Sequence, residues 1–140
     1  MPRIVIDTNV VVAGLRSRRG CSFRLLSFLG GSAFDTVISV PLLLEYEAVL
    51  KQQASAMGLT RADVDDFLDF VCRVSDQQEI HFLWRPTLQD PRDEFVLELA
   101  VESRSDFIIT HNTRHFVGAA QFGVEVVTPR QFLRLIGVAR

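Results

Sequence analysis

Ile4-Val-Ile-Asp-Thr-Asn-Val10 is the stretch of sequence that decides the fold. Its β-branched start predicts a short buried strand, and the polar Asp7-Thr-Asn9 marks the point where that strand ends. A second run of this kind, Phe107-Ile-Ile109, is followed in the same way by Thr110-His-Asn112. In open α/β sheets ligands bind beyond the carboxyl ends of the strands, so both polar segments are candidates for a binding site.

Predicted helices and strands alternate along the rest of the chain. Short β-branched runs delimit the strands, while prolines, glycines and capping pairs delimit the helices. The alternation predicts a single α/β domain over residues 1–140, with a parallel sheet covered by helices on both faces, a three-layer sandwich. The predicted strands are 3–7, 36–40, 79–83, 106–110 and 124–127, and the predicted helices are 22–29, 41–53, one opening at Thr60, 91–103 and 130–136.

The composition indicates a cytoplasmic protein without membrane association. Apolar residues make up 48% of the chain, yet every apolar run is far shorter than the ~20 residues that cross a bilayer. The start of the chain shows no signal-peptide pattern. Cys21 and Cys72 lack Cys-x-x-Cys spacing and are expected to be buried, reduced thiols.

The charge pattern does not by itself select a substrate. The net charge of −2 is unlike that of a basic nucleic-acid-binding domain. All basic residues except Lys51 are arginines. Arginine binds phosphate well through paired hydrogen bonds, and genome composition explains the bias equally well. Neither a Gly-x-Gly-x-x-Gly nor a Walker loop is present, so nucleotide binding has no support.

Asp7 and Glu45 occupy positions where a carboxylate is unusual. Asp7 directly follows a buried strand, where loss of hydration must be compensated by a cation or by hydrogen bonds. Glu45 falls at the edge of an apolar stripe, beside Leu42 and Val49. Each has a structural alternative, since Asp7 is a suitable helix cap and Glu45 can extend its carboxylate from the edge of the core into solvent.

Asp93 is the most informative of the acidic residues. In the predicted helix 91–103 it shares a face with Val96, Leu97 and Ala100, so its carboxylate is expected to point inward from the first turn. A capping pair with Asp90 is the structural alternative. The opposite face is predicted to be solvated, and it carries Glu94, Glu98 and Glu102.

The segment Thr110-His-Asn112 adds oxygen ligands to this set. The hydroxyl of Thr110 and the amide oxygen of Asn112 suit Mg²⁺ or its bound waters. His111 and His115 are either a transition-metal pair or ordinary loop histidines, and the post-strand turn without a nearby cysteine favours the second interpretation.

Taken in order, these segments resemble the PIN-domain family, in particular the bacterial and archaeal toxins of toxin–antitoxin pairs akin to VapC. The matching stretches are 4–10, 41–50, 90–93 with 97–100, and 107–112 with 115–116. The resemblance implies a PIN-like parallel sheet of about five strands and metal-dependent cleavage of RNA. It also implies a homodimer and a small antitoxin protein as partners.

The resemblance also implies roles for individual residues. Asp7, Glu45 and Asp93 match the family's first three acidic positions and would hold Mg²⁺ or Mn²⁺, with Asn112 as a further ligand. Thr8, Asn9 and Thr110 would orient these carboxylates or their bound waters. Such an ion would activate a water molecule for phosphodiester hydrolysis. Substrate phosphates would need a basic rim, and the loop arginines that either form it or are ordinary surface are Arg16, Arg18, Arg19, Arg92 and Arg114.

Asn112 is the main departure from the family pattern. Many PIN nucleases carry aspartate there, so the chain is either a weakened nuclease or a binding module for RNA or protein. A phosphatase or receiver domain is a third possibility, but Asn9 stands where such a phosphatase needs a second aspartate.

Two further expectations concern the site and the assembly. If the carboxylates converge, repulsion between them should raise the pKa of at least one. The helix bearing Val64, Phe67, Leu68 and Val71 is a candidate dimer face, with burial inside the monomer as the alternative.

Overall fold

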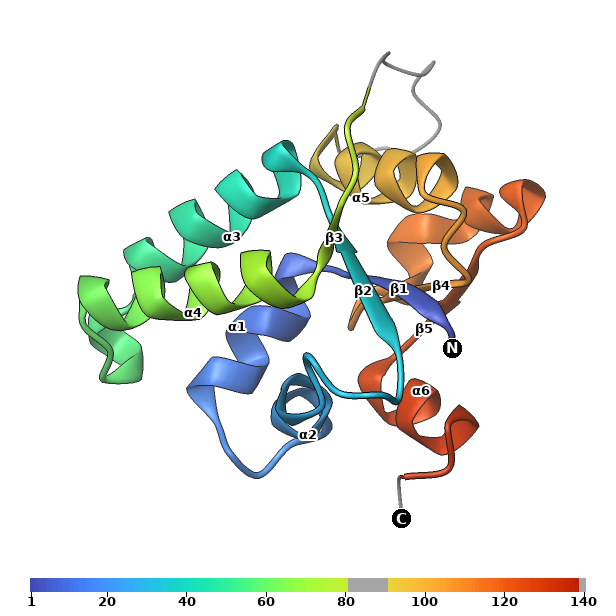
Figure 1. Ribbon diagram of the computed structural model, residues 1–140. Helices are drawn as coiled ribbons and strands as arrows, with labels where there is room; N and C mark the ends of the chain where they lie inside the picture. Colours follow the sequence, from blue (N-terminus) through green and yellow to red (C-terminus); the bar gives the residue numbers. More distant parts are fainter. Residues whose placement is uncertain (81–90, 139–140) are drawn as a thin grey trace.

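The computed structural model describes residues 1–80 and 91–138, without the side chains of residues 91 and 92. Within this part a parallel five-stranded sheet has the order β3-β2-β1-β4-β5 (Figure 1). The strands are β1 Arg3–Ile6, β2 Asp35–Ile38, β3 Asp76–Gln77, β4 Phe107–Ile109 and β5 Glu125–Val127. The helices are α1 Thr8–Arg16, α2 Cys21–Ser27, α3 Val40–Gln53, η1 Ser55–Met57, α4 Arg61–Val74, α5 Pro91–Glu102, η2 Thr113–Phe122 and α6 Pro129–Leu135, η1 and η2 being 3₁₀-helical.

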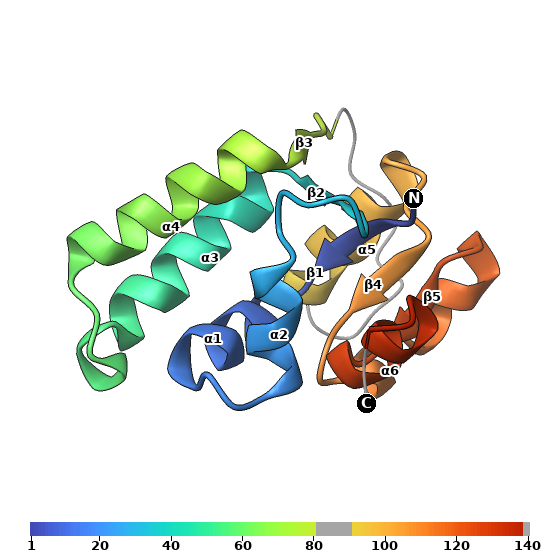
Figure 2. The same ribbon diagram turned by 60° about the horizontal axis from the view of Figure 1, so that its bottom comes forward.

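Helices cover both faces of the sheet, which confirms the predicted three-layer α/β fold. On one face α5 packs across the central strands with η2 beside it, and α1, α2 and α6 lie on the other (Figures 1 and 2). Helices α3 and α4 form a hairpin that projects to one side of the sheet (Figure 2). None of the described helices is long and apolar enough to span a bilayer.

The central strands place two polar segments side by side. Ile4, Val5, Ile108 and Ile109 are fully buried, as expected of parallel strands covered on both faces. Ile6 of β1 lies opposite Ile109 of β4 in the register. Because both strands end there, the two polar segments that follow them emerge together at the carboxyl edge of the sheet.

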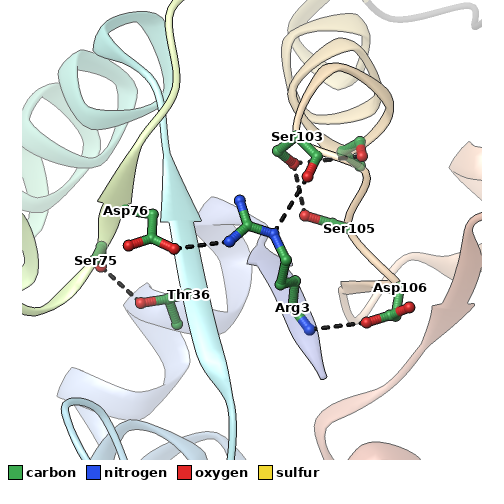
Figure 3. A network of polar contacts seen from close by, with 8 residues as sticks. Arg3, Thr36, Ser75, Asp76, Ser103, Ser105 and Asp106 are labelled. Carbon is green, nitrogen blue, oxygen red and sulfur yellow. Dashed lines mark hydrogen bonds and ion pairs between the residues drawn. The ribbon is translucent and has the colours of Figure 1, made fainter. Parts of the chain in front are cut away.

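A polar network around Arg3 joins the amino-terminal ends of several strands (Figure 3). The Arg3 guanidinium lies 2.7 Å from a carboxylate oxygen of Asp76 and donates to the backbone carbonyl of Ser103 at 3.2 Å. The backbone N–H of Arg3 donates to Asp106 at 2.9 Å. The network links β1 to the start of β3 and to the turn before β4, at the edge of the sheet opposite Asp7.

Capping chemistry fixes several helix starts as predicted. Thr60 and Asp63 form a reciprocal capping box at α4. Thr128 and Gln131 form another at α6, where Pro129 occupies the first turn. In the predicted helix beginning after Thr60, Val64 is completely buried, and Leu68 and Val71 are buried with it. That apolar face therefore belongs to the core of the chain and is not a free dimer surface.

Three local expectations differ from the structure. No helix is predicted over residues 8–15, yet Asp7 caps α1 there. The strand predicted over 79–83 forms earlier, as β3; residues 79 and 80 are not in a strand, and 81–83 lie outside the described residues. The free thiols of Cys21 and Cys72 are partly rather than fully buried.

A close approach of two helices explains why a glycine is tolerated inside α1. A β-carbon on Gly14 would lie 2.4 Å from the Cδ1 atom of Leu26 in α2 and 3.0 Å from the backbone oxygen of Ser22. The missing side chain therefore lets α2 pack directly on α1, which holds α1 against the sheet.

Candidate active site

A cleft of about 410 Å³ contains the three acidic residues singled out in the sequence. Asp7 comes from the end of β1, Glu45 from α3 and Asp93 from the first turn of α5, and all three line the cleft. The fold therefore brings together carboxylates that are far apart in the chain. The other lining residues are Thr8, Asn9, Val12, Ala13, Arg16, Val49, Gln53, Asn112 and His115.

Asp7 is held in place by a dense set of hydrogen bonds. Its Oδ1 atom accepts from the backbone N–H of Thr8 at 2.8 Å, which caps α1. Its Oδ2 atom accepts from the hydroxyl of Thr110 at 2.7 Å and from the amide of Asn9 at 3.3 Å. The capping role and the position in the cleft are thus compatible, and the carboxylate has a defined orientation.

Burial raises the pKa of Asp7 above its ordinary value of 3.8. The hydrogen bonds from Thr110 and Thr8 act in the opposite direction, as do the neighbouring His115 and His111. The rise in pKa is found at Asp7, but its largest cause there is loss of hydration, and repulsion from another carboxylate is not among its causes. Because Asp7 is only 7% exposed, its ionised form lacks the hydration that it would have in water.

Tyr46 fixes α3, and with it Glu45, against the end of β1. Its buried hydroxyl donates to the backbone carbonyl of Ile6, the residue before Asp7. Burial holds the pKa of Tyr46 well above 10.0, and the negative charges of Asp7 and Glu45 add to the effect. Both carboxylates therefore act on the same hydroxyl group. The partly buried Glu45 lies at the edge of the apolar face, as predicted.

Asp93 points inward, as its spacing predicts. It is 9% exposed, and its predicted neighbours Val96, Leu97 and Ala100 are completely buried. From η2, the Nδ1 atom of His115 lies 3.4 Å from its Oδ2 atom. An imidazole from a neighbouring element thus stands beside this carboxylate.

The solvated face predicted for α5 is not found, because Glu94 and Glu102 are only partly exposed and Glu98 is buried. Glu98 is only 5% exposed, whereas Phe95 is 38% exposed. The helix contacts the sheet, α3 and η2. A larger part of its surface is therefore covered than in a helix that packs on a sheet alone. A simple two-sided pattern therefore does not describe α5.

The hydroxyl of Thr110 organises the turn after β4. Thr110 is completely buried; besides donating to Asp7, its oxygen accepts from the backbone N–H of Asn112 at 3.0 Å and from the Asn9 amide at 3.3 Å. It touches the ligand candidates and does not itself line the cleft. The exposed Asn112 does line it, in the position that the sequence predicts for a further ligand.

The two histidines near this turn have different partners. The Nε2 atom of His111 is hydrogen-bonded to the hydroxyl of Ser22 at 2.8 Å, whereas His115 faces Asp93. This separation favours loop histidines over a transition-metal pair.

The donors in the cleft fit a hard divalent cation in their chemistry. Carboxylate, amide and hydroxyl oxygens are the ligands that Mg²⁺ and Mn²⁺ prefer. The hydroxyl of Thr8 is buried there with no hydrogen-bond partner in the described part of the chain. Across residues 1–80 and 91–138, however, no group of three or more His, Cys, Asp or Glu side chains is positioned to hold a metal ion. Binding therefore requires the carboxylates to turn towards one another.

At the outer end of the cleft lie Arg16, which the sequence names only as one of five candidate rim arginines, and Gln53, which it does not single out. Arg16 is expected in a loop but is the last residue of α1, and Gln53 is the last residue of α3. In α3, Glu45, Val49 and Gln53 are four residues apart and therefore share one helix face. In α1, Asn9, Ala13 and Arg16 are spaced by four and three residues and share a face in the same way. This spacing is the signal that could have placed Gln53 and Arg16 on the cleft. Using it requires knowing that residues 8–16 are helical.

Comparison with protein families and known structures gives one family match and several similar folds. The family model described as PIN domain matches residues 3–114, which include Asp7, Glu45, Asp93 and Asn112. No curated protein matches the chain.

Three solved structures share the fold at low sequence identity. The crystal structure of VapBC2 from Rickettsia felis bound to a DNA fragment from their promoter matches with a TM-score of 0.62 and 12% identity, over 89% of this chain and 96% of that one. VapBC-1 from nontypeable Haemophilus influenzae matches with a TM-score of 0.60 and 15% identity, over 91% and 98%. A domain of a functionally unknown protein from Methanocaldococcus jannaschii matches with a TM-score of 0.53 and 16% identity, over 91% of each chain.

Proposed function

The chain belongs to the PIN domain family, and from this premise we propose that it is a metal-dependent endoribonuclease that cleaves RNA in the cytoplasm. The observation that carries the proposal is the cleft that Asp7, Glu45 and Asp93 line together at the carboxyl edge of the sheet. Burial raises the pKa of Asp7, so its ionised form gains more from a nearby cation than a hydrated carboxylate would. Family membership also removes the basis for the phosphatase or receiver alternative.

Asp7, Glu45 and Asp93 would hold Mg²⁺ or Mn²⁺, with Asn112 supplying an amide oxygen. The bound ion would supply an activated water and neutralise charge on the scissile phosphate. Thr110 and the backbone of Thr8 fix the rotation of the Asp7 carboxylate through their hydrogen bonds. Asn9 connects Asp7 to Thr110 through its amide group and accepts from the backbone of His111 at 3.2 Å. Asp7 is thus oriented by residues that need not touch the ion.

We further propose that the chain is the toxin of a toxin–antitoxin pair, partnered by a small antitoxin protein and forming a homodimer. The support is the similarity of fold to the two VapBC structures and the match to the PIN domain model.

The decisive experiment is cleavage of a structured RNA across a range of Mg²⁺ and Mn²⁺ concentrations. The native chain should cut only with a divalent ion, and Asp7→Asn should abolish cutting. Asp69→Asn is the matched control, because it makes the same change at an exposed position of α4. Mn²⁺ should also raise the melting temperature of the native and control proteins, since a ligand at 100 times its Kd stabilises by about 2.7 kcal/mol. That shift should be much smaller in Asp7→Asn.

A specific residue keeps a second candidate function open. Asn112 lies on the cleft where many PIN nucleases carry aspartate, and the amide reduces the negative charge available to an ion. A native protein that binds RNA but neither cuts it nor gains stability from Mn²⁺ would be a binding module built on the PIN fold. Equal cleavage by the native chain and Asp7→Asn would remove Asp7 from the mechanism.

A further inference from the structure

The cleft continues beyond the carboxylates as a groove between α1 and α3. Both helices begin at the carboxyl edge of the sheet, because they follow the parallel strands β1 and β2, and they run away from it side by side (Figures 1 and 2). Successive turns of each helix contribute lining residues. From α1 these are Asn9, Val12, Ala13 and Arg16, and from α3 they are Glu45, Val49 and Gln53.

The two ends of this groove differ in charge. At a rise of about 1.5 Å per residue, Arg16 lies roughly 10 Å along α1 from Asn9, and Gln53 roughly 12 Å along α3 from Glu45. The near end is acidic, and the section between carries the apolar side chains of Val12 and Val49. Arg16 is the one arginine or lysine among the described residues that line the cleft.

Arg16 is oriented across the groove by a neutral partner. Its Nη2 atom donates to the Oε1 atom of Gln53, so the last turns of α1 and α3 are joined at this point. An amide does not cancel the charge of the guanidinium, and the bond uses only one of its N–H donors. Arg16 is exposed, so the remaining donors are accessible to a ligand.

We propose that Arg16, oriented by Gln53, binds a phosphate of single-stranded RNA next to the scissile one and so holds the strand along the α1–α3 groove. The inference rests on the proposed ribonuclease function and names a substrate contact of the same cleft. An acidic pocket repels a polyanion, so a fixed cation further along the groove is needed to retain the strand. The planar guanidinium suits the two oxygens of a phosphate. The apolar middle section suits the less polar ribose and base between two phosphates.

The test is the salt dependence of RNA binding under conditions that prevent cleavage. A fluorescent single-stranded RNA oligonucleotide is titrated with protein in EDTA at several salt concentrations. The logarithm of the binding constant falls linearly with the logarithm of the salt concentration. Losing one phosphate contact should make this slope less negative by about 0.7 for a single strand. Arg16→Gln should show this reduction together with roughly tenfold weaker binding. Tenfold corresponds to the low end of the range for a hydrogen bond to a charged group, as expected at an exposed site.

Three further variants separate a specific contact from a general effect of charge. Arg130→Gln removes the same charge from the exposed surface of α6 and should keep the native slope. Arg16→Lys should restore the slope but only part of the affinity, because lysine keeps the charge and loses the paired geometry. Gln53→Ala should keep the slope and weaken binding by less than Arg16→Gln does. Equal slopes for the native chain and Arg16→Gln, or equal losses in Arg16→Gln and Arg130→Gln, would overturn the proposal.

Kinetics with Mn²⁺ distinguish failure of this inference from failure of the proposed function. Arg16→Gln should raise KM and leave kcat close to the native value, whereas Asp7→Asn should remove kcat. A native chain that cuts RNA while Arg16→Gln keeps both the native KM and the native slope refutes the Arg16 contact alone. A native chain that binds RNA with an Arg16-dependent slope but never cuts it refutes the nuclease function and supports the contact. A native chain that binds no RNA refutes both.

Discussion

Replacing Thr110 with valine should destabilise the protein and raise the pKa of Asp7 further. Valine has nearly the same shape, so the change removes the hydroxyl without opening a cavity. The hydroxyl donates to the Asp7 carboxylate at 2.7 Å from a completely buried position. A hydrogen bond to a charged group contributes about 1.5–3 kcal/mol, and the bond from the Asn112 N–H at 3.0 Å is lost as well. We expect a loss of about 2–3 kcal/mol at neutral pH, which lowers the folded-to-unfolded ratio roughly 30- to 160-fold.

The pH dependence of this loss identifies its cause. Because the bond from Thr110 favours the ionised form of Asp7, its removal costs more when Asp7 is charged than when it is protonated. The difference in stability between native protein and variant should therefore grow as pH rises from the raised pKa of Asp7 in the folded native protein to its still higher pKa in the folded variant, and then level off, because the two unfolded chains titrate alike. Urea unfolding followed by circular dichroism at a series of pH values measures the difference. Carboxyl NMR titration of Asp7 measures the pKa directly.

Thr110→Ser is the control for this experiment. It keeps the hydroxyl and loses one buried methyl group, which contributes about 0.8 kcal/mol or slightly more at any pH. If the serine and valine variants lose the same stability, and neither loss varies with pH, then the hydroxyl of Thr110 does not support the Asp7 carboxylate. Asp7 would then not be held in its orientation by Thr110, although this is its shortest hydrogen bond.

Two further predictions concern the missing carboxylate and the assembly. Asn112→Asp should tighten Mn²⁺ binding in calorimetry, because the charge of the ligands is a main control on the affinity for hard cations. An unchanged Kd would place residue 112 outside the ligand set. Light scattering should give twice the 15.8 kDa mass of one chain at micromolar concentration, and a single-chain mass across that range would contradict the homodimer.

The parts of the fold that the sequence predicts are those in which local and long-range preferences agree. The runs 4–6 and 107–109 are apolar and rich in β-branched residues, and all of them except the partly buried Phe107 lie in the buried centre of the sheet. The helix starts at Thr60 and Thr128 were predictable because each capping pair satisfies backbone groups locally. Helix α1 was missed because residues 10–12 are three successive valines, which favour strand in isolation. Packing on α2 through Gly14, and the cap from Asp7, stabilise the helix instead.

For the site, spacing predicted which carboxylates face inward but not what surrounds them. The inward position of Asp93 follows from its helical distance to Val96 and Leu97, which is a local property. Contacts between elements were not predictable in this way. The placement of His115 beside Asp93 and the bond between Arg16 and Gln53 depend on how η2 and α3 dock, and the sequence carries no periodic signal for docking. The burial of Glu98 has the same origin, since it results from the neighbours of α5 and not from α5 itself.

The environment of Asp7 also makes the cleft a source of instability in the absence of a cation. The pKa of folded Asp7 lies above its value in the unfolded chain, so between these two values the folded state binds more protons. Stability should therefore fall as pH rises through that interval, and the deficit should persist at neutral pH. Asparagine at position 7 would cap α1 without a buried charge, and the hydroxyl of Thr110 can rotate to accept from its amide group. The Asp7→Asn protein should thus be the more stable one in EDTA, whereas saturating Mn²⁺ should reverse the order because only aspartate supplies the anion. Melting curves of both proteins in the two conditions test this reversal. An Asp7→Asn protein that is less stable than the native protein in EDTA as well would show that the buried charge of Asp7 does not destabilise the folded state.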